Sequence, residues 1–314
     1  MNEFVPLSPL PVPRFVRCLL LLTALLIASS ALPAQQMAIT FDDLPAHGEL
    51  PPNTSRLQIA STILAALKAA NMPPTYGFIN GSTVAEDPEN AAVLKAWRDA
   101  GQPLGNHTWS HPSLNDLPAA AFEQEIEQNE PLLKQFMGEQ DWHWFRYPFL
   151  NEGDTRAKRR DVRAWLTAHG YRIAEVNMDF EDYLWNDPYA RCSARKDDVA
   201  IKRLHDTYLA TADQYIRVFH RLSHMVYGRD VKYVLLLHVG AFDARMLPDL
   251  LRLYRHRGFH FISLPEAEKD RAYRDNPDLG DKSGGTLLEQ MMEKRHLPFF
   301  DYTKPYRELD KMCR

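Results

Sequence analysis

Short apolar runs alternate with longer amphipathic segments over most of the chain. Seven runs have the length and residue types of β-strands, and we predict strands at 37–41, 75–79, 103–106, 143–147, 171–176, 232–238 and 260–263. Helices are predicted at 55–70, 156–169, 200–227 and 286–294. The longest connection, 187–230, is expected to be a helical crossover and not a separate domain. Because strands that alternate with helices pair in parallel, the pattern predicts an α/β fold.

The first residues do not follow this pattern. Arg14 and Arg17 precede an apolar run at 18–28, and small residues come after it, which is typical of a cleaved signal peptide at 1–34. The run has about 11 residues, whereas a helix that spans a bilayer needs about 20. We therefore expect an exported protein, in the periplasm or outside the cell, with no stable membrane span after signal removal.

The composition is that of an ordinary folded domain. The chain has 314 residues, of which 45% are hydrophobic and 25% charged, so it can bury a large core. The strand and helix pattern ends near residue 267, and we predict one domain at 35–268 followed by a C-terminal extension at 269–314. The sequence leaves the oligomeric state open.

The charge balance does not favour a nucleic-acid partner. The formal net charge is -4, and removal of Glu3, Arg14 and Arg17, which together carry +1, makes it -5. Nucleic-acid binding needs a basic surface. The short basic run at 158–160 is expected to be a solvated helix face, so no nucleic-acid partner is predicted.

Two cysteines, Cys192 and Cys313, remain after signal removal. An oxidising compartment favours a disulfide between them, which would connect the C-terminal extension to the middle of the chain. The alternative is two buried, unpaired thiols, and both interpretations stay open.

Polar residues follow the first and third predicted strands. Asp42 and Asp43 end the first strand, and His107 and His111 lie four residues apart after the third. In α/β barrels the carboxyl ends of the strands hold the catalytic groups. Two histidines and a carboxylate form the three-ligand arrangement of catalytic zinc, with one position open for water. A helix cap at the acidic pair and a solvated loop at the histidines are the alternatives.

Three further predicted strands also end in polar residues. Arg146 ends the fourth strand, Asp179 and Asp182 follow the fifth, and His238 ends the sixth. Each has an ordinary structural explanation alone, but together these strand ends favour a functional site.

Two other histidine pairs with the same spacing are interpreted as structural. His220 and His224 fall within a long helix with no evident acidic strand end beside them. His256 and His260 lie on either side of Gly258 at a junction between a helix and a strand.

Five motifs now give a resemblance to a known family. They are Thr40-Phe41-Asp42-Asp43, His107-Thr108-Trp109-Ser110-His111-Pro112, Arg146-Tyr147-Pro148, Asp179 to Tyr183, and Leu236-Leu237-His238. In this order, across roughly residues 37–265, they resemble the polysaccharide deacetylases, also called the NodB-homology family or carbohydrate esterase family 4. The resemblance implies a distorted (β/α)7 barrel that hydrolyses acetyl groups, usually N-acetyl, from a glycan. It also implies one divalent metal ion, most often Zn²⁺, with Co²⁺, Ni²⁺ or Mn²⁺ as alternatives.

The resemblance also implies a role for each motif residue. Asp43, His107 and His111 would hold the metal. Asp42 would be the general base that takes a proton from metal-bound water, and His238 would be the general acid for the leaving amine.

The remaining matched residues would support this chemistry. Asp182 would orient and charge His238, Arg146 would hold the carboxylates in place, and Asp179 belongs to the same catalytic set. The backbone N–H of Phe149 would stabilise the oxyanion, an effect worth about 3 to 4 kcal/mol for a good donor. The side chains of Leu236 and Tyr183 would form a slot for the acetyl methyl.

Three positions depart from the family pattern. Leu44 replaces the usual glycine after the acidic pair, Tyr183 replaces the usual tryptophan, and Phe149-Leu150 follows the proline of the third motif. None of these removes a predicted ligand or proton-transfer group. They change the rim and the acyl slot, so the resemblance predicts the reaction more firmly than the substrate.

The first functional hypothesis is therefore a metal-dependent deacetylase of an acetylated glycan such as peptidoglycan or chitin-type oligomers. The alternatives are an O-acetyl xylan esterase, a hydrolase of a small non-sugar amide, and a glycan-binding protein without turnover. A row of exposed aromatics along the site would favour a polymer. A lid formed by the C-terminal extension would favour a small molecule.

Overall fold

The computed structural model describes Met1 and residues 35–280, 284–299 and 306–314. The predicted signal peptide therefore falls outside the described residues. Gln35–Arg314 form one compact unit, and the border predicted at 268 within it stays a prediction. Within the described residues, no helix has both the length and the apolar character needed to cross a bilayer.

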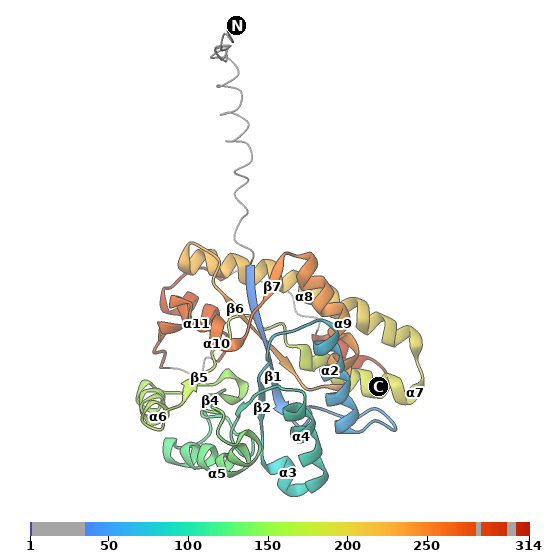
Figure 1. Ribbon diagram of the computed structural model, residues 1–314, viewed down its shortest axis with the longest axis horizontal. Coiled ribbons are helices and arrows are strands. Elements are labelled where there is room, and N and C mark those ends of the chain that lie inside the picture. Colours follow the sequence, from blue (N-terminus) through green and yellow to red (C-terminus); the bar gives the residue numbers. More distant parts are fainter. Residues whose placement is uncertain (2–34, 281–283, 300–305) are drawn as a thin grey trace. The chain divides into compact units, whose positions relative to one another are not determined.

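All seven predicted strands form, and most are shorter than predicted. They are β1 (Gln35–Leu44), β2 (Gly77–Ile79), β3 (Leu104–Asn106), β4 (Trp144–Phe145), β5 (Arg172–Ile173), β6 (Tyr233–His238) and β7 (Phe259–Phe261). Every pair is parallel, in the order β5-β4-β3-β2-β1-β6, and β7 pairs with the first residues of β1. A bridge between Met178 and Leu235 brings the segment after β5 to the free side of β6. The sheet thus curls toward closure as a distorted (β/α)7 barrel, the predicted fold (Figure 1).

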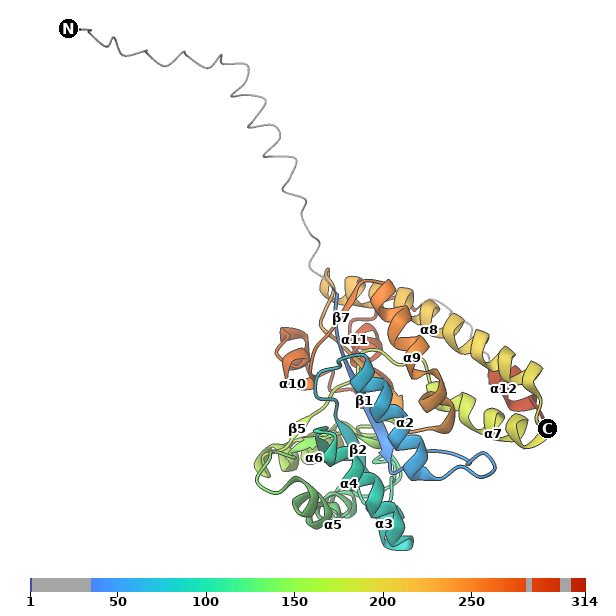
Figure 2. The same ribbon diagram turned by 45° about the vertical axis from the view of Figure 1, so that its right-hand side comes forward.

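Helices surround this sheet (Figures 1 and 2). They are α2 (Arg56–Ala69), α3 (Ser82–Glu86), α4 (Ala91–Asp99), α5 (Ala119–Met137), α6 (Arg156–Ala168), α7 (Asn186–Arg195), α8 (Asp198–Tyr227), α9 (Ala241–His256), α10 (Leu264–Ala267), α11 (Leu287–Lys294) and α12 (Tyr306–Lys311). The helices predicted at 55–70, 156–169, 200–227 and 286–294 correspond to α2, α6, α8 and α11. The long crossover is helical, as expected, because α7 and α8 fill most of it.

The basic run at 158–160 is not uniformly solvated, so that prediction was wrong for its central residue. Arg159 is only 1% exposed, and its guanidinium lies 2.9 Å from the Glu152 carboxylate, which is buried with it. A helix face alternates between core and solvent every few residues, so a basic triplet does not stay on one side of it. Arg160 remains exposed.

The sheet places polar residues beside one another at one edge. The apolar residues of β1 and β6, from Met37 to Phe41 and from Tyr233 to Leu237, are almost fully buried. Their parallel register continues to the pair Asp42 and His238, which lie side by side at the carboxyl ends of the strands. The burial of these two strands therefore fixes where the acidic pair meets the histidine.

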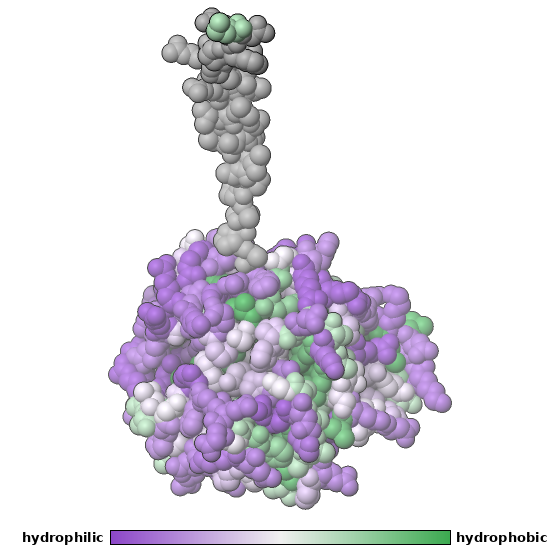
Figure 3. Space-filling view, viewed as in Figure 1, coloured by the Kyte–Doolittle hydropathy of each residue, from purple (hydrophilic) through white to green (hydrophobic). Residues whose placement is uncertain are grey.

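A disulfide joins Cys192 of α7 to Cys313, which follows α12, with Cα atoms 5.1 Å apart. It connects the C-terminal extension to the barrel, and Figure 2 shows α12 beside α7. Of the two interpretations left open by the sequence, the structure shows the disulfide. Hydrophilic residues make up most of the molecular face seen in Figure 3.

Candidate active site

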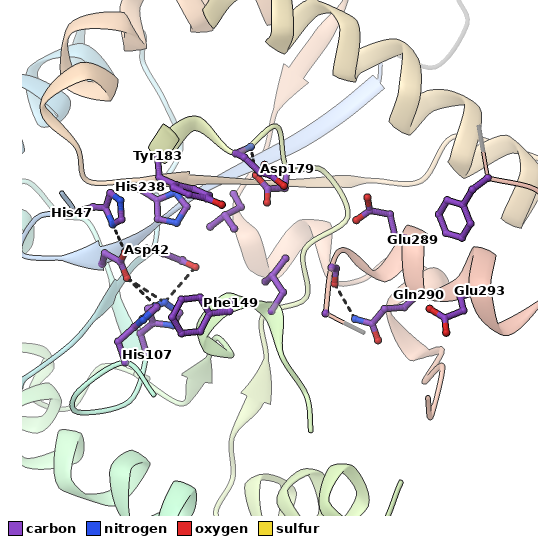
Figure 4. Close-up of a pocket in the computed structure, with 18 residues that line it drawn as sticks. Asp42, His47, His107, Phe149, Asp179, Tyr183, His238, Glu289, Gln290 and Glu293 are labelled. Atoms are coloured by element: carbon purple, nitrogen blue, oxygen red, sulfur yellow. Dashed lines mark hydrogen bonds and ion pairs between the residues drawn. The ribbon is translucent and has the colours of Figure 1, made fainter. Parts of the chain in front are cut away.

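The polar strand ends converge on a cavity of about 550 Å³ (Figure 4). Nine of the predicted site residues line it, namely Asp42, Asp43, His107, His111, Phe149, Asp179, Tyr183, Leu236 and His238. The other two, Arg146 and Asp182, lie behind this lining, where each contacts a residue of the cavity. Residues from five separate stretches of the barrel are thus brought to one place.

Asp43, His107 and His111 form a three-donor cluster in this cavity. The Asp43 Oδ1 atom lies 3.5 Å from His107 Nε2 and 3.3 Å from His111 Nε2. Zinc with nitrogen and oxygen ligands at about 2.0 to 2.2 Å in tetrahedral geometry requires ligand atoms about 3.3 to 3.5 Å apart. These two distances match that spacing.

The protonation of the cluster also suits a cation. The His107 Nδ1 atom lies 2.8 Å from the Arg146 carbonyl oxygen, which can only accept, so Nδ1 donates to it and Nε2 is the ring nitrogen that faces Asp43. Burial and the neighbouring His107 lower the pKa of His111 to about 4, so its ring is neutral. Burial alone would raise the pKa of Asp43, but His107 and His47 hold it well below its ordinary value.

One buried oxygen atom of this cluster has no hydrogen-bond donor among the described residues. Asp43 Oδ1 is buried and accepts no hydrogen bond from the described residues. A buried carboxylate oxygen without a donor is costly unless a cation or water satisfies it. The orphaned oxygen and the two histidine nitrogens that face it therefore fit a divalent metal ion.

Asp42 lies beside this cluster and is held by Arg146. One guanidinium nitrogen of Arg146, NH1, lies 3.2 Å from both carboxylate oxygens of Asp42. The guanidinium also donates to Thr40 Oγ1 and to the Ala174 carbonyl, and it packs 4.8 Å from the centre of the Phe78 ring. Since Arg146 is 1% exposed, it fixes the carboxylate from the side opposite the cavity.

His238 is paired with a fully buried carboxylate. Asp182 Oδ1 lies 2.8 Å from His238 Nδ1, and Oδ2 accepts the backbone N–H of the same residue at 2.7 Å. Burial lowers the pKa of His238, but the charge of Asp182 outweighs it and raises the pKa to about 10. His238 is therefore an imidazolium at neutral pH, with Nε2–H available to the cavity.

A buried polar network surrounds this pair. Asn186 Nδ2 and Tyr208 OH each donate to Asp243, at 2.8 and 2.9 Å. Burial and the nearby Asp182 raise the pKa of Asp243 well above its ordinary value. Asp243 therefore binds a proton more readily than an ordinary carboxyl group, beside the pair of Asp182 and His238.

The cavity rim contains several strained backbone positions. Asp43, His111, Phe149 and Glu181 have φ between 57 and 62°, in the left-handed region that non-glycine residues rarely adopt. Such strain costs about 1 to 3 kcal/mol for each residue and collects at functional sites. All four residues line the cavity, which supports its interpretation as the functional site.

Aromatic rings and the aliphatic side chains of Leu150 and Leu236 also line the barrel side of the cavity. Tyr183 packs edge-on against His238 and His47, with ring centres 5.2 and 5.7 Å apart. Leu236 is 4% exposed and lines the same cavity. The Phe149 ring lies 4.5 Å from that of His111 and is 60% exposed at the mouth.

Asp179 lines the cavity but has a different environment from Asp42. It accepts the backbone N–H of Glu181 at 2.7 Å. Burial raises the pKa of Asp179 to about 7, although that hydrogen bond lowers it. The group therefore changes charge near neutral pH.

Sequence analysis missed His47, which lines the cavity. Its Nδ1 atom lies 2.8 Å from Asp43 Oδ2, so it turns the other carboxylate oxygen toward His107 and His111. A histidine four residues after a candidate ligand was the available signal.

Sequence analysis considered a lid formed by the C-terminal extension but named none of its residues. The extension supplies a wall of the cavity through Gly284, Gly285, Glu289, Gln290, Glu293 and Phe299. Figure 4 shows the α11 residues of this wall across the cavity from Asp42 and His238. No motif marked them, because their place depends on how the extension folds back.

The structure corrects one statement about the other histidine pairs. An acidic residue does lie beside His220 and His224: Asp230 Oδ1 is 3.2 and 3.5 Å from their Nε2 atoms. Asp230 comes just before β6, and the turn at Gly228 brings it back to the helix. His256 and His260 are both exposed.

Comparison with known proteins identifies the domain. Residues 29–174 match the model of the polysaccharide deacetylase family. The chain carries a polysaccharide deacetylase domain. The matched range includes Asp42, His107 and Arg146, whereas Asp182 and His238 lie beyond it and are connected to the site by the geometry above.

Two of the individual proteins that the chain matches are also polysaccharide deacetylases by name. A chitin deacetylase from Pestalotiopsis sp is 27% identical over 150 residues, covering 48% of this chain and 44% of that protein. A peptidoglycan-N-acetylglucosamine deacetylase from Bacillus cereus is 26% identical over 148 residues, covering 47% of this chain and 46% of that protein. The chain thus spans about half the length of the curated relatives it matches.

A solved structure supports the fold. A pseudoenzyme of carbohydrate esterase family 4 from Bacillus anthracis superposes with a TM-score of 0.51 at 15% identity, covering 75% of this chain and 66% of that chain. Its description as a pseudoenzyme shows that this fold can occur without turnover. Any activity of the present protein must therefore be argued from its own side chains.

Proposed function

We propose that this protein is a metal-dependent hydrolase that removes acetyl groups, most often N-acetyl, from a glycan such as peptidoglycan or chitin-type oligomers. The observation that carries the proposal is the pairing of Asp42 with His238 beside the three-donor cluster. Asp42 is an ion-paired carboxylate and His238 an imidazolium. A site with one group to accept a proton and one to donate it suits amide hydrolysis.

Asp43, His107 and His111 would hold the metal ion, since they provide the orphaned oxygen and two nitrogens described above. Nitrogen and oxygen donors of this kind suit Zn²⁺ first, with Co²⁺, Ni²⁺ or Mn²⁺ as alternatives. When bound, such an ion lowers the pKa of water and polarises the carbonyl of the acetyl group. His47 would keep Asp43 turned toward it.

Proton transfer would use the two residues beside the cluster. Asp42 accepts a proton from the water that attacks the acetyl carbonyl carbon, while Arg146 keeps its carboxylate aimed at the cavity. His238 then donates its Nε2 proton to the amine nitrogen as the carbon–nitrogen bond breaks. The products are acetate and a free amine, and Asp182 stabilises the imidazolium until that step.

The acetyl group would be recognised by the cavity lining. Leu236 and Tyr183 supply the apolar and aromatic surface for the methyl group. Phe149 lies beside His107, across from Tyr183 and His238 in Figure 4, and its backbone N–H would assist the developing oxyanion. A small slot favours acetyl over longer acyl groups, because each additional methylene must find room.

A small non-sugar amide is a second candidate substrate, and the wall built by the C-terminal extension favours it. Glu289, Gln290 and Glu293 face the reactive residues across the cavity. A wall on this side limits how long a polymer can lie across the site. Short oligomers and small amides are therefore both compatible with the cavity.

We also propose export to the periplasm or the medium, with no nucleic-acid partner. The features that support export are the charged and apolar pattern at 1–34 and the disulfide.

The substitution Asp42→Asn tests the mechanism. It keeps the size of the side chain but removes its basicity, so we expect acetyl hydrolysis to fall about 10² to 10⁴-fold. Metal content and binding of the uncleaved ligand should match the wild type. Asp99→Asn, at an exposed residue paired with Lys95, is the matched control and should keep wild-type turnover.

Folding of both variants is checked by thermal unfolding. A folded Asp42→Asn variant with wild-type turnover would contradict the assigned base. A folded variant that lost its metal would instead show that Asp42 is a ligand.

A further inference from the structure

A second cluster of metal-binding side chains lies outside the active-site cavity. His220 and His224 occupy the last turns of α8, and Asp230 lies in the connection to β6. Their nearest donor atoms all lie within 4.8 Å of one another. None of the three residues lines the cavity described above.

The spacing of this cluster repeats that of the active site. Asp230 Oδ1 lies 3.2 Å from His220 Nε2 and 3.5 Å from His224 Nε2. Tetrahedral zinc with nitrogen and oxygen ligands requires edges of about 3.3 to 3.5 Å. A separation of four residues on a helix places both rings on one face, and they lie nearly parallel, 4.7 Å apart.

Neighbouring residues hold the carboxylate in place. Tyr233 OH donates to Asp230 Oδ1 at 2.9 Å, and Gln35 Nε2 donates to Oδ2 at 3.4 Å. A carboxylate oxygen has two lone pairs, so Oδ1 can keep the tyrosine bond and still bind a cation. Such outer hydrogen bonds orient metal ligands and raise affinity.

The cluster is open to solvent. The side chains of His220, His224 and Asp230 are 43, 47 and 34% exposed. A cation can therefore reach them without unfolding of the barrel. Water can fill the fourth position of a tetrahedral ion.

The two clusters lie at opposite ends of the same strands. Gln35 begins β1 and Asp42 lies near its end, and seven residues of strand span about 23 Å. Asp230 likewise precedes β6, which ends at His238. An ion at one cluster is therefore too far away to be shared with the other.

We propose that His220, His224 and Asp230 form a second site for a first-row divalent metal ion such as Zn²⁺. Two imidazoles and one carboxylate favour such ions over Ca²⁺ or Mg²⁺, which prefer oxygen ligands. The bound ion joins the end of α8 to the segment that enters β6, so it stabilises this corner of the barrel. The site is independent of the deacetylase proposal.

Zinc stoichiometry tests the proposal, with protein that carries no histidine tag. Metal-free protein is titrated with Zn²⁺ in a calorimeter, and bound metal is measured after gel filtration. We expect two equivalents in the wild type and one in His224→Ala. His256→Ala, at an exposed histidine four residues from His260, is the matched control and should keep two.

Variants of the first cluster make the assignment specific. His111→Ala should bind one equivalent, and Zn²⁺ should still raise its melting temperature, because an ion that binds only the folded state stabilises it. His111→Ala combined with His224→Ala should lose both effects. A single equivalent in the wild type that is lost in His111→Ala and kept in His224→Ala, or a second equivalent that survives His224→Ala, would overturn the proposal. Loss of one equivalent in His256→Ala would also overturn it, since ordinary surface histidines would then explain the binding.

Discussion

The pairing of Asp182 with His238 predicts how the reaction should depend on pH. Asp182 Oδ1 lies 2.8 Å from His238 Nδ1 and raises the pKa of the imidazole to about 10, against burial, which lowers it. The substitution Asp182→Asn removes the charge and keeps the size. Without this carboxylate, burial still lowers the pKa of His238 and only the charges of Asp43 and Asp42 raise it, so the pKa should fall toward its ordinary value of about 6.5.

The size of the effect follows from the protonated fraction of His238. At pH 8 an imidazole with a pKa of about 10 is almost fully protonated, whereas one with a pKa of about 6.5 is about 3% protonated. The general acid would therefore be depleted about 30-fold at pH 8 and hardly at all at pH 5.5. The ratio of wild-type to variant rate should rise with pH over this interval.

The assay is kcat/KM for acetate release between pH 5.5 and 9.5, at saturating metal. Asp187→Asn, on the exposed side of α7, provides the matched control, since Asp187 accepts the backbone N–H of Glu49 at 3.0 Å and the asparagine oxygen can accept it too. The control should follow the wild-type profile. A rate ratio for Asp182→Asn that does not change with pH would refute the role of His238 as a charged acid.

The same pair links stability to pH. The pKa of His238 is higher in the folded protein than its ordinary value of about 6.5, so its stabilisation is present in full below that pH. It is lost as the pH rises through about 10. This part of the pH dependence should disappear in Asp182→Asn when unfolding by urea is followed at several pH values.

Three further predictions follow from buried contacts. Arg146→Met leaves the carboxylate of Asp42 buried without its cation, so the free energy of unfolding in urea should fall by about 3 to 5 kcal/mol; an unchanged midpoint would contradict the ion pair. Replacing Cys192 and Cys313 by serine opens a loop with a sequence separation of 121 residues, and should lower stability by about 2 to 5 kcal/mol, as should a reductant applied to the wild type; equal melting temperatures would argue against the disulfide. Asp43→Ala removes a proposed ligand and should reduce the metal content by one equivalent, whereas full metal content would remove Asp43 from the site.

The sequence predicted the barrel well because its strands have a strong local signal. Apolar residues such as those of 232–238 have one favourable place, between the barrel interior and the surrounding helices, and this fixed the number and parallel direction of the strands. The predicted bounds of the strands were less accurate than their number and direction. β4 and β5 have two residues each, because hydrogen bonding there depends on how the sheet curls.

The candidate site also contains residues that could be predicted from the sequence and residues that could not. Residues that follow strands, such as Asp42, Asp43 and His238, could be placed from the pattern, because parallel strands end at one edge. His47 and the α11 wall could not, since their positions depend on loops that fold back over the site. The position of Asp230 beside His220 and His224 likewise depends on the tight turn after α8.

The central claim is that the cavity removes acetyl groups, and acetate release measures this directly. Zinc-loaded protein is incubated with N-acetylglucosamine oligomers, peptidoglycan, acetylated xylan and small N-acetyl amides, and Asp42→Asn serves as the blank. The account predicts acetate from N-acetylated oligomers or small amides, lost both in the blank and after chelation. If folded, metal-loaded protein released no acetate from any of these substrates, the central claim would be contradicted. Acetate release that persisted in Asp42→Asn would contradict the proposed chemistry.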